Sequence, residues 1–278
     1  MRIDAHQHFW LLAARVGQWP PPELAPIHRD FVPEDLRPVL RANGVAGTVL
    51  VQSLPDVAET RFLLSLAARH SFVLGVVGWV DLKAPDAAAV ISDLAAHPKL
   101  RALRPMLQDI EDPNWIDDPA LDAGVAAMRA HDLCFDGLVK PPHLLALHRF
   151  AQRHADLPIV IDHGGKPEIA SGAFTDWRRR MRALAALPNV HVKLSGLLTE
   201  AGGGGLPALR PYVETLVELF GFDRMLWGSD WPVLLLADSY GSWLSMCLQL
   251  IPEAAHAAVF SDNARSVYRL GRPDPIPE

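Results

Sequence analysis

The chain has 278 residues, of which 50% are hydrophobic, and a formal net charge of −6, a size typical of a single α/β barrel rather than of two joined domains. The acidic balance argues against a nucleic-acid partner, and no run approaches the roughly 20 uncharged apolar residues that a membrane span needs. Because the N-terminus lacks the pattern of a secretion signal and the two cysteines, Cys134 and Cys247, lie far apart, we expect a cytoplasmic protein without a membrane or nucleic-acid partner.

Short apolar runs alternate with longer segments of helical period, which is typical of βαβ units with a parallel sheet. The eight expected strands are Arg2–Phe9, Val45–Ser53, Phe72–Asp81, Leu100–Leu107, Leu133–Lys140, Pro158–Lys166, Asn189–Leu197 and Arg224–Val233. The helices between them include Glu59–His70, Ala87–Ala96, Ala120–Ala130 and Leu209–Phe220. This order predicts an α/β fold, a (β/α)8 TIM barrel that forms a single domain over residues 1–278. An open doubly wound sheet is the alternative, but no GxGxxG motif follows the first strand.

Two connections stand out by composition. A Pro-rich stretch from Trp19 to Pro33 makes an unusually long connection after the first strand, and long loops in compact domains are often lids. Gly202–Gly205 is a run of four glycines whose backbone freedom suits a mobile loop. A plain surface loop is the alternative reading of both.

Titratable residues follow several strands at the end where a barrel carries its chemistry. His6 and His8 lie on the same side of the first strand, because side chains alternate along a strand. His163 emerges from the sixth strand into a Gly-Gly turn, and Asp230 follows the eighth strand. An unpaired buried Asp230 would be costly, so we expect it to face the histidines. His6, His8, His163 and Asp230 are therefore the candidate ligands of a divalent metal such as Zn²⁺, and Asp230 could also deprotonate a water.

Further polar residues of the strands could face the same end of the barrel. The candidates for substrate binding are Gln52, Arg104, Lys140 and Lys193, with Trp231 as a surface for stacking. Arg104 suits a carbonyl or carboxylate because its donors form a fork. Lys193 could equally pair with an acid inside the barrel, and Lys140 could point outward. Asp4 points to the same side of the first strand as the two histidines, one layer deeper, and we expect it to fix the tautomer of an imidazole by a hydrogen bond.

Several segments resemble one known family. They are Ile3–Trp10, Asp162–Pro167, Lys193–Leu197, Gly228–Val233 and Asn263–Arg265. Together they resemble the amidohydrolase-2 group of the amidohydrolase superfamily, and within it the sugar lactone hydrolases of the L-fucono- and L-rhamnono-lactonase type. The resemblance implies a TIM barrel in which water opens a lactone ring. It also implies that Asp230 is the general base and that the histidines, including His163, polarise the carbonyl with or without a metal.

The fourth strand departs from this family pattern. Such lactonases tend to have Arg-His where this chain has Arg104-Pro105, so its specificity could differ. Because Arg104 is essentially the one arginine at a strand end, a neutral or singly charged sugar lactone fits better than a dicarboxylate. The alternatives are a metal-dependent decarboxylase of the same superfamily and a non-catalytic sugar-binding barrel. A homo-oligomer is compatible with the sequence.

Overall fold

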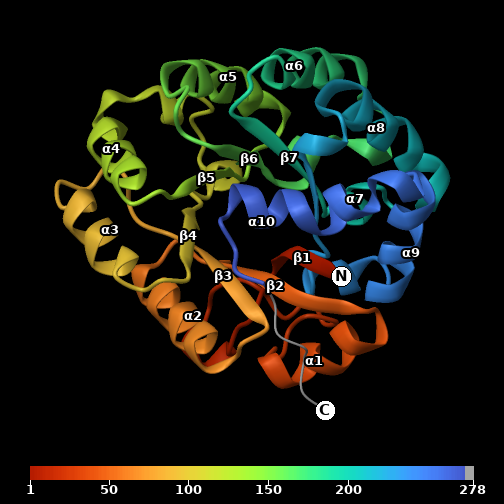
Figure 1. The fold of residues 1–278 in the computed structure, drawn as a ribbon, viewed down its shortest axis with the longest axis horizontal. Helices are drawn as coiled ribbons and strands as arrows, with labels where there is room; N and C mark the ends of the chain where they lie inside the picture. The colour runs from red at the N-terminus through yellow and green to blue at the C-terminus, as the bar shows by residue number, and fades with distance from the viewer. Residues whose placement is uncertain (273–278) are drawn as a thin grey trace.

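Eight parallel strands follow one another around one sheet in chain order in the computed structural model, which describes residues 1–272 (Figure 1). The strands are β1 (Arg2–Gln7), β2 (Val45–Val51), β3 (Val73–Gly78), β4 (Leu100–Leu103), β5 (Cys134–Gly137), β6 (Ile159–Ile161), β7 (Val190–Leu194) and β8 (Met225–Trp227). The sheet closes beyond β8, where the backbone N–H of Asp230 donates to the His6 carbonyl at 2.8 Å and that of His8 donates to the Trp231 carbonyl at 2.8 Å. Closure thus runs through the residues that we expected to carry the chemistry.

Helices surround the strands and connect each to the next (Figure 1). They are α1 (Pro33–Ala42), α2 (Val57–Arg69), α3 (Ala87–Ala95), α4 (Asp122–Ala130), α5 (Leu144–Arg153), α6 (Thr175–Ala185), α7 (Leu197–Glu200), α8 (Gly205–Phe220), α9 (Tyr240–Leu250) and α10 (Asn263–Val267). The expected (β/α)8 barrel is confirmed. No helix within residues 1–272 is long and apolar enough to cross a membrane.

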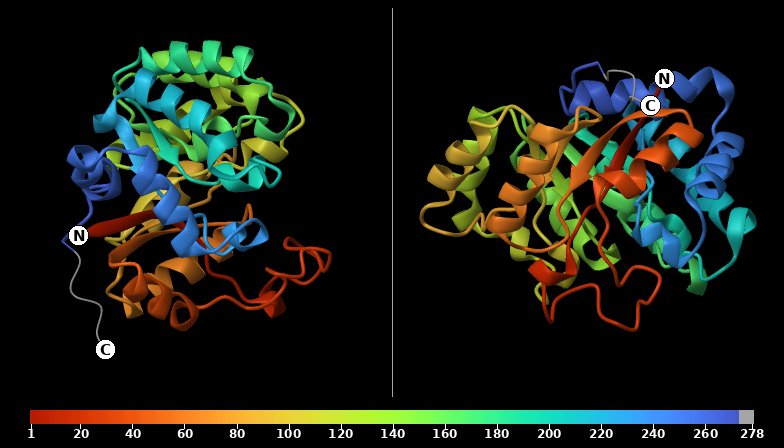
Figure 2. Two further views of the ribbon diagram at one scale, coloured as in Figure 1. Left: turned by 90° about the vertical axis from the view of Figure 1, so that its right-hand side faces the viewer. Right: turned by 90° about the horizontal axis from the view of Figure 1, so that it is seen from below.

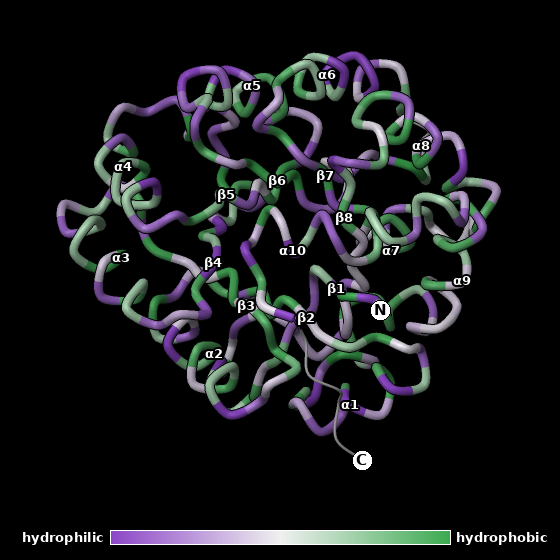
Figure 3. The backbone as a smooth tube through the Cα atoms, in the orientation of Figure 1, coloured by the Kyte–Doolittle hydropathy of each residue, from purple (hydrophilic) through white to green (hydrophobic). Residues whose placement is uncertain are grey.

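Two sets of buried side chains hold the barrel together. One lies between the strands and the helices, and the other fills the barrel interior with residues such as Ile3, Val49 and Val160. Helix α10 and the residues after it close the amino-terminal end, because Val267 and Tyr268 belong to the interior set. Figure 3 shows hydrophobic residues along the central strands and many hydrophilic ones on the surrounding helices and loops. The carboxyl end of the barrel is therefore the end left for a site.

The expected strands contain the observed ones but extend too far at their carboxyl ends. The clearest case is the expected strand Pro158–Lys166, of which only Ile159–Ile161 pairs as β6. The chain turns at His163 and Lys166, whose φ angles of 53° and 46° are left-handed. A strand cannot continue through such angles. The same turn is what directs the histidine toward the barrel axis.

The connection between β1 and α1 is a long loop, residues 8–32, as the Pro-rich sequence indicated. Its base is held by a pair of backbone hydrogen bonds between Trp10 and Phe31, each 2.9 Å long. Figure 2 shows this loop, coloured red, projecting from the barrel on the side opposite to α10. It therefore lies at the carboxyl end.

Candidate active site

Three imidazoles surround one carboxylate at the carboxyl end of the barrel. Asp230 Oδ1 lies 3.6 Å from His6 Nε2, 3.2 Å from His8 Nε2 and 3.9 Å from His163 Nε2. His6 belongs to β1, His8 follows the end of β1, and His163 and Asp230 follow β6 and β8. The structure thus brings together the residues that the sequence placed at the strand ends.

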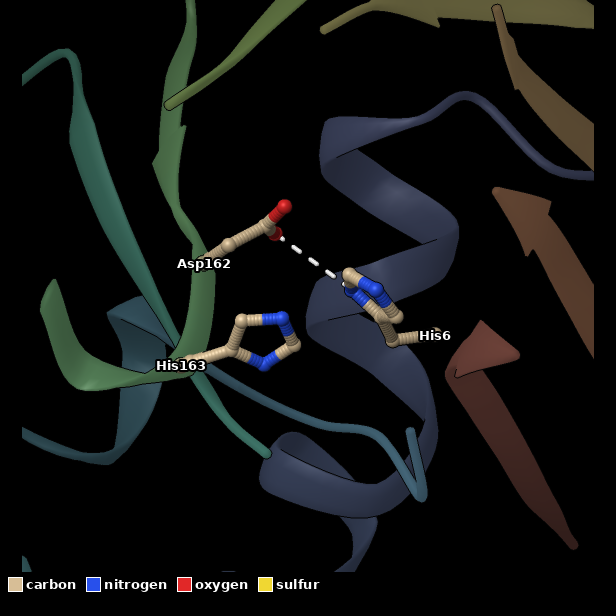
Figure 4. Close-up of side chains that lie close together, drawn as sticks. All are labelled: His6, Asp162 and His163. Atoms are coloured by element: carbon tan, nitrogen blue, oxygen red, sulfur yellow. Dashed lines mark ion pairs between the residues drawn. The ribbon is translucent and has the colours of Figure 1, made fainter. Parts of the chain in front are cut away.

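The other ring nitrogen of each histidine faces a group that orients the ring. His8 Nδ1 lies 2.8 Å from the Val51 carbonyl oxygen, which can only accept, so Nδ1 carries a proton. His163 Nδ1 lies 3.0 Å from Ser195 Oγ. His6 Nδ1 lies 3.4 Å from Asp162 Oδ1, the contact dashed in Figure 4, and 3.3 Å from Lys193 Nζ. All three Nε2 atoms face Asp230, and His6 Nε2 also lies 3.4 Å from Arg104 Nη1.

This arrangement fits a divalent metal. His6, His8 and Asp230 can place one donor atom each within 4.8 Å of one another, and so can His6, Asp162 and His163. Imidazole nitrogens and a carboxylate oxygen are donors that Zn²⁺ accepts. Three of the four predicted donors thus form one group, while the fourth, His163, groups with His6 and with Asp162, which the sequence did not single out as a ligand. The metal ligands stay a prediction.

Positive φ angles and two glycines make the close packing of the site feasible. Asp230 has a φ of 62°, a conformation that aspartate and asparagine tolerate better than most residues. A Cβ on Gly196 would lie 2.4 Å from His163 Nδ1, and one on Gly228 would lie 2.7 Å from the His6 Cβ. Only glycine leaves room for the two imidazoles at these positions.

Asp4 fixes the ends of two strands rather than an imidazole tautomer, so that expectation was wrong. Its Oδ1 accepts from the backbone N–H groups of Ser229 at 2.8 Å and His6 at 3.1 Å, and its Oδ2 accepts from the Tyr240 hydroxyl at 2.9 Å. Burial raises the pKa of Asp4 to about 6. Asp4 thereby holds β1 and the segment after β8 at the spacing that the site requires.

Four paired charges, Arg104, Asp136, Asp162 and Lys193, form what we call the charged layer of the barrel. Lys193 Nζ lies 2.6 Å from Asp136 Oδ2 and 2.9 Å from Asp162 Oδ1. Arg104 Nη1 lies 3.0 Å from Asp162 Oδ2. Although burial lowers the pKa of Lys193, the two carboxylates raise it above the ordinary value of 10.5. Lys193 is accordingly an ammonium group, and its side chain is 0% exposed.

A cavity of about 450 Å³ opens onto Asp230. Its polar lining residues are His8, Ser53, Arg104, Gln108, Asp109, His163, Lys166 and Asp230, and its apolar ones are Trp19, Leu24, Leu54, Pro55, Met106, Leu138, Val233 and Leu236. Trp19 and Leu24 belong to the long loop after β1, which therefore contributes to the wall as a lid would.

Five residues were predicted to bind substrate. Arg104 is among the described residues that line this cavity, whereas Gln52, Lys140, Lys193 and Trp231 are not. Gln52 is buried and donates to the Arg104 carbonyl at 2.7 Å. Trp231 packs against Phe31, with 5.1 Å between ring centroids. Lys140 is exposed, with Nζ 3.1 Å from the Gln108 carbonyl oxygen, and Lys193 lies in the charged layer. Their contact with a substrate stays a prediction, whereas Arg104 does reach the cavity.

Several lining residues were not singled out from the sequence. Lys166 follows the Gly-Gly turn and pairs with Glu200 at 3.1 Å. Trp19 opens the Pro-rich stretch, so the expectation of a lid was the signal that could have found it. Pro105, where the chain departs from the family pattern, lines a neighbouring cavity of about 270 Å³ that also includes Trp79.

Burial and charge set the protonation states in the site. Burial lowers the pKa of His163 to about 4, so this imidazole is neutral near pH 7. Burial raises the pKa of the Asp230 carboxyl, but His163, His8 and His6 more than offset this, and the pKa lies below the ordinary value of 3.8. Asp230 is thus an ionised acceptor beside a neutral imidazole.

The sequence pattern of a family described as "Amidohydrolase" matches residues 3–270. The chain belongs to the amidohydrolase family. An L-fucono-1,5-lactonase of Burkholderia ambifaria is 55% identical, and the match covers 98% of this chain and 97% of that protein. Two crystal structures of an amidohydrolase from Burkholderia multivorans, with bound HEPES and with bound zinc, are each 36% identical. They match 98% of this chain and 100% of theirs, with TM-scores of 0.92 and 0.90. The expected family is confirmed.

Proposed function

We propose that this protein hydrolyses the lactone of a sugar acid, with Asp230 activating the attacking water. The observation that carries the proposal is the ionised Asp230 carboxylate, which lines a cavity and is surrounded by three imidazole Nε2 atoms. The 55% identity with an L-fucono-1,5-lactonase supports the reaction class.

Lactone opening needs a base, a stabilised oxyanion and a proton for the leaving alkoxide. Asp230 takes a proton from a water held between its carboxylate and the lactone carbonyl. Having accepted that proton, the Asp230 carboxylic acid returns it to the ring oxygen as the C–O bond breaks. One residue then serves as base and acid in succession.

Charge that develops on the carbonyl oxygen requires donors on the cavity wall. Arg104 lines the cavity and its guanidinium is already oriented by Asp162, at 3.0 Å. A fixed cation of this kind stabilises an oxyanion without reorganising during the reaction. We assign this role to Arg104, with His163 beside it on the wall.

The donors for a metal would be His6, His8, His163 and Asp230, with Asp162 next to them. A bound Zn²⁺ would polarise the carbonyl and lower the pKa of a bound water to about 7. The zinc-containing family structure supports this assignment. Zinc content can be measured by mass spectrometry after loading and desalting. We expect one ion in the wild type and a clear loss in His8→Gln, whereas equal zinc in both proteins would contradict the assignment.

The cavity wall favours a lactone with hydroxyl groups and an apolar side. Ser53, Gln108 and Asp109 can hydrogen-bond hydroxyls, while Trp19, Leu54 and Leu138 offer apolar surface. Of the two cationic side chains on the wall, Arg104 and Lys166, each already faces a carboxylate. A neutral sugar lactone therefore fits better than a dicarboxylate, and L-fucono-1,5-lactone is the first compound to assay.

A pH-indicator screen of aldonolactones, run with and without a chelator, tests the proposal. We expect acid release from at least one aldonolactone at rates well above spontaneous opening, and the chelator arm shows whether a metal takes part. Release of CO₂ from a carboxylated substrate, with no lactone opened, would favour the alternative decarboxylase. Binding of lactones without turnover would favour a non-catalytic sugar-binding barrel.

Cytoplasmic location and assembly into a homo-oligomer stay predictions. The two cysteines, Cys134 and Cys247, are buried and free, which fits a reducing compartment. Fractionation of cells and light scattering would test the two predictions.

A further inference from the structure

We propose that Arg15 and Glu59 form a latch that positions one wall of the cavity and so sets affinity for the lactone. The inference rests on the proposed lactone hydrolysis. Neither side chain lines the cavity within the described chain, and both are buried, at 5% and 8% exposure. Arg15 lies in the loop after β1, and Glu59 lies in the first turn of α2. Their guanidinium and carboxylate groups meet at 2.7 Å.

Glu59 holds the segment that follows β2. Its Oε2 accepts from the backbone N–H groups of Ser53 at 3.2 Å and Leu54 at 2.5 Å, and its Oε1 accepts from the Ser53 hydroxyl at 2.9 Å. Ser53 and Leu54 both line the cavity. A single carboxylate therefore fixes the backbone and one side chain of this part of the wall.

Arg15 connects this part of the wall to Trp19 in the loop after β1. Its Nη1 donates to the Ser53 hydroxyl at 3.0 Å and to the Trp19 carbonyl at 3.2 Å. Its guanidinium lies 5.3 Å from the centre of the Trp10 ring, and that ring lies 5.1 Å from the Trp19 ring. The indole of Trp19 is thereby held at the cavity by a set of contacts that converge on Arg15.

Within the described chain, the latch is the polar connection of residues 12–28 of this loop to the barrel. Among the hydrogen bonds and ion pairs of residues 1–272, those of Arg15 alone join residues 12–28 to a residue outside the loop. Ile27, fully buried in the core, anchors the far side of the loop, and the Trp10–Phe31 bridge closes its base. Loss of Arg15 should accordingly free the part around Trp19 and leave the loop attached.

The choice of arginine and glutamate is informative in itself. A buried ion pair is often no more stabilising than apolar residues of similar size, so stability alone explains it poorly. Arg15 reaches three acceptors from one planar fork, which a lysine ammonium on a flexible stem does not reproduce. The pair thus suits the precise placement of two wall segments.

Steady-state kinetics on the best lactone tests the latch. For Arg15→Met we expect KM to rise about 10-fold with kcat within about 3-fold of the wild type, because the wall residues that Arg15 positions bind substrate and transition state alike. Arg15→Lys should recover part of the loss. In the Trp19→Ala background, Arg15→Met should add little, because contacting residues that act together are not additive. A fall in kcat as large as the rise in KM, or fully additive effects, would overturn the proposal.

Hydrogen exchange gives a second reading that needs no turnover. Arg15→Met should raise exchange in residues 12–28 and leave residues 225–231 unchanged. The control is Arg61→Met. Arg61 lies in α2, as Glu59 does, and its loss removes a surface ion pair with Asp93, so exchange should stay unchanged in both segments. Because Arg15→Met leaves Glu59 unpaired, the double variant Arg15→Met, Glu59→Gln is measured beside it. Unchanged exchange in residues 12–28 of both variants contradicts the latch, whereas a wild type that opens no lactone contradicts only the proposed function.

Discussion

The charged layer and the group around Asp230 lie side by side inside the barrel, yet they use buried charge in opposite ways. In the layer, Lys193 is 0% exposed and its ammonium faces two carboxylates. Asp230 is almost as buried, at 5% exposure, but its carboxylate faces three imidazoles and lines a cavity. Burial alone does not identify a catalytic group. What distinguishes the two regions is whether the charge is met by other charges or by a space that a substrate can enter.

We predict that changes of Asp136 or Lys193, which are not among the described residues that line the cavity, act mainly on stability, whereas changes of Arg104 and of the residues around Asp230 act on turnover. The largest effect on stability is expected for Lys193→Met, which leaves Asp136 without its cation and Asp162 paired with Arg104 alone. Removing one partner of a buried ion pair costs about 3–5 kcal/mol. Chemical denaturation measures this, with Lys83→Met as a control, because Lys83 pairs with Asp118 at the surface and should cost less than about 1 kcal/mol. Equal free energies of unfolding for Lys193→Met and Lys83→Met would contradict the structural role of the charged layer.

Gly196→Ala tests the other region without touching a charge. The added methyl would lie 2.4 Å from His163 Nδ1 and should displace the imidazole by a fraction of an ångström or more. A misplacement of about 1 Å can lower a rate about 100-fold, so we expect kcat to fall by about 10- to 100-fold.

The control for this variant is Gly172→Ala. Gly172 has a similar φ of 71°, and a Cβ there would meet no atom of the described chain within 4 Å. It imposes the same backbone strain at a distance from the site, so kcat should stay within about 2-fold. Comparable losses in both variants would mean that backbone strain, rather than the position of His163, lowers the rate.

The smallest effect is expected for Lys140→Ala. The sequence predicted that Lys140 binds substrate, but its side chain is exposed, is not among the described residues that line the cavity, and donates to the backbone carbonyl of Gln108, a lining residue. We expect kcat and KM within about 2-fold of the wild type. A KM raised 10-fold or more would show that Lys140 does bind the substrate.

Much of the fold and of the site could be predicted because both depend on local patterns. Apolar runs of strand length predict β1 to β8, and the parity of His6 and His8 predicts that both side chains face one way. The position of a side chain along the barrel axis is not a local pattern. The side chain of Lys193 points into the barrel, as that of a site residue would. However, Lys193 lies within β7 rather than after it, and its ammonium contacts Asp136, 57 residues away in the sequence.

The wall of the cavity was the part that the sequence predicted least well. Trp19 reaches the cavity because Arg15 pairs with Glu59, 44 residues further along the chain. No periodicity signals such a pair. The length and proline content of the loop indicated a lid, but its contacts are set by tertiary packing.

The central claim is that Asp230 activates the water that opens the lactone, and Asp230→Asn tests it most directly. Asparagine tolerates the left-handed φ of 62° at this position, so the melting temperature should stay close to that of the wild type. The measurement is kcat/KM on the best aldonolactone, together with the melting temperature of both proteins. We expect a loss of about 1,000-fold or more in a folded protein, in the range of general acid–base catalysis. A folded Asp230→Asn protein with near-wild-type turnover would contradict it.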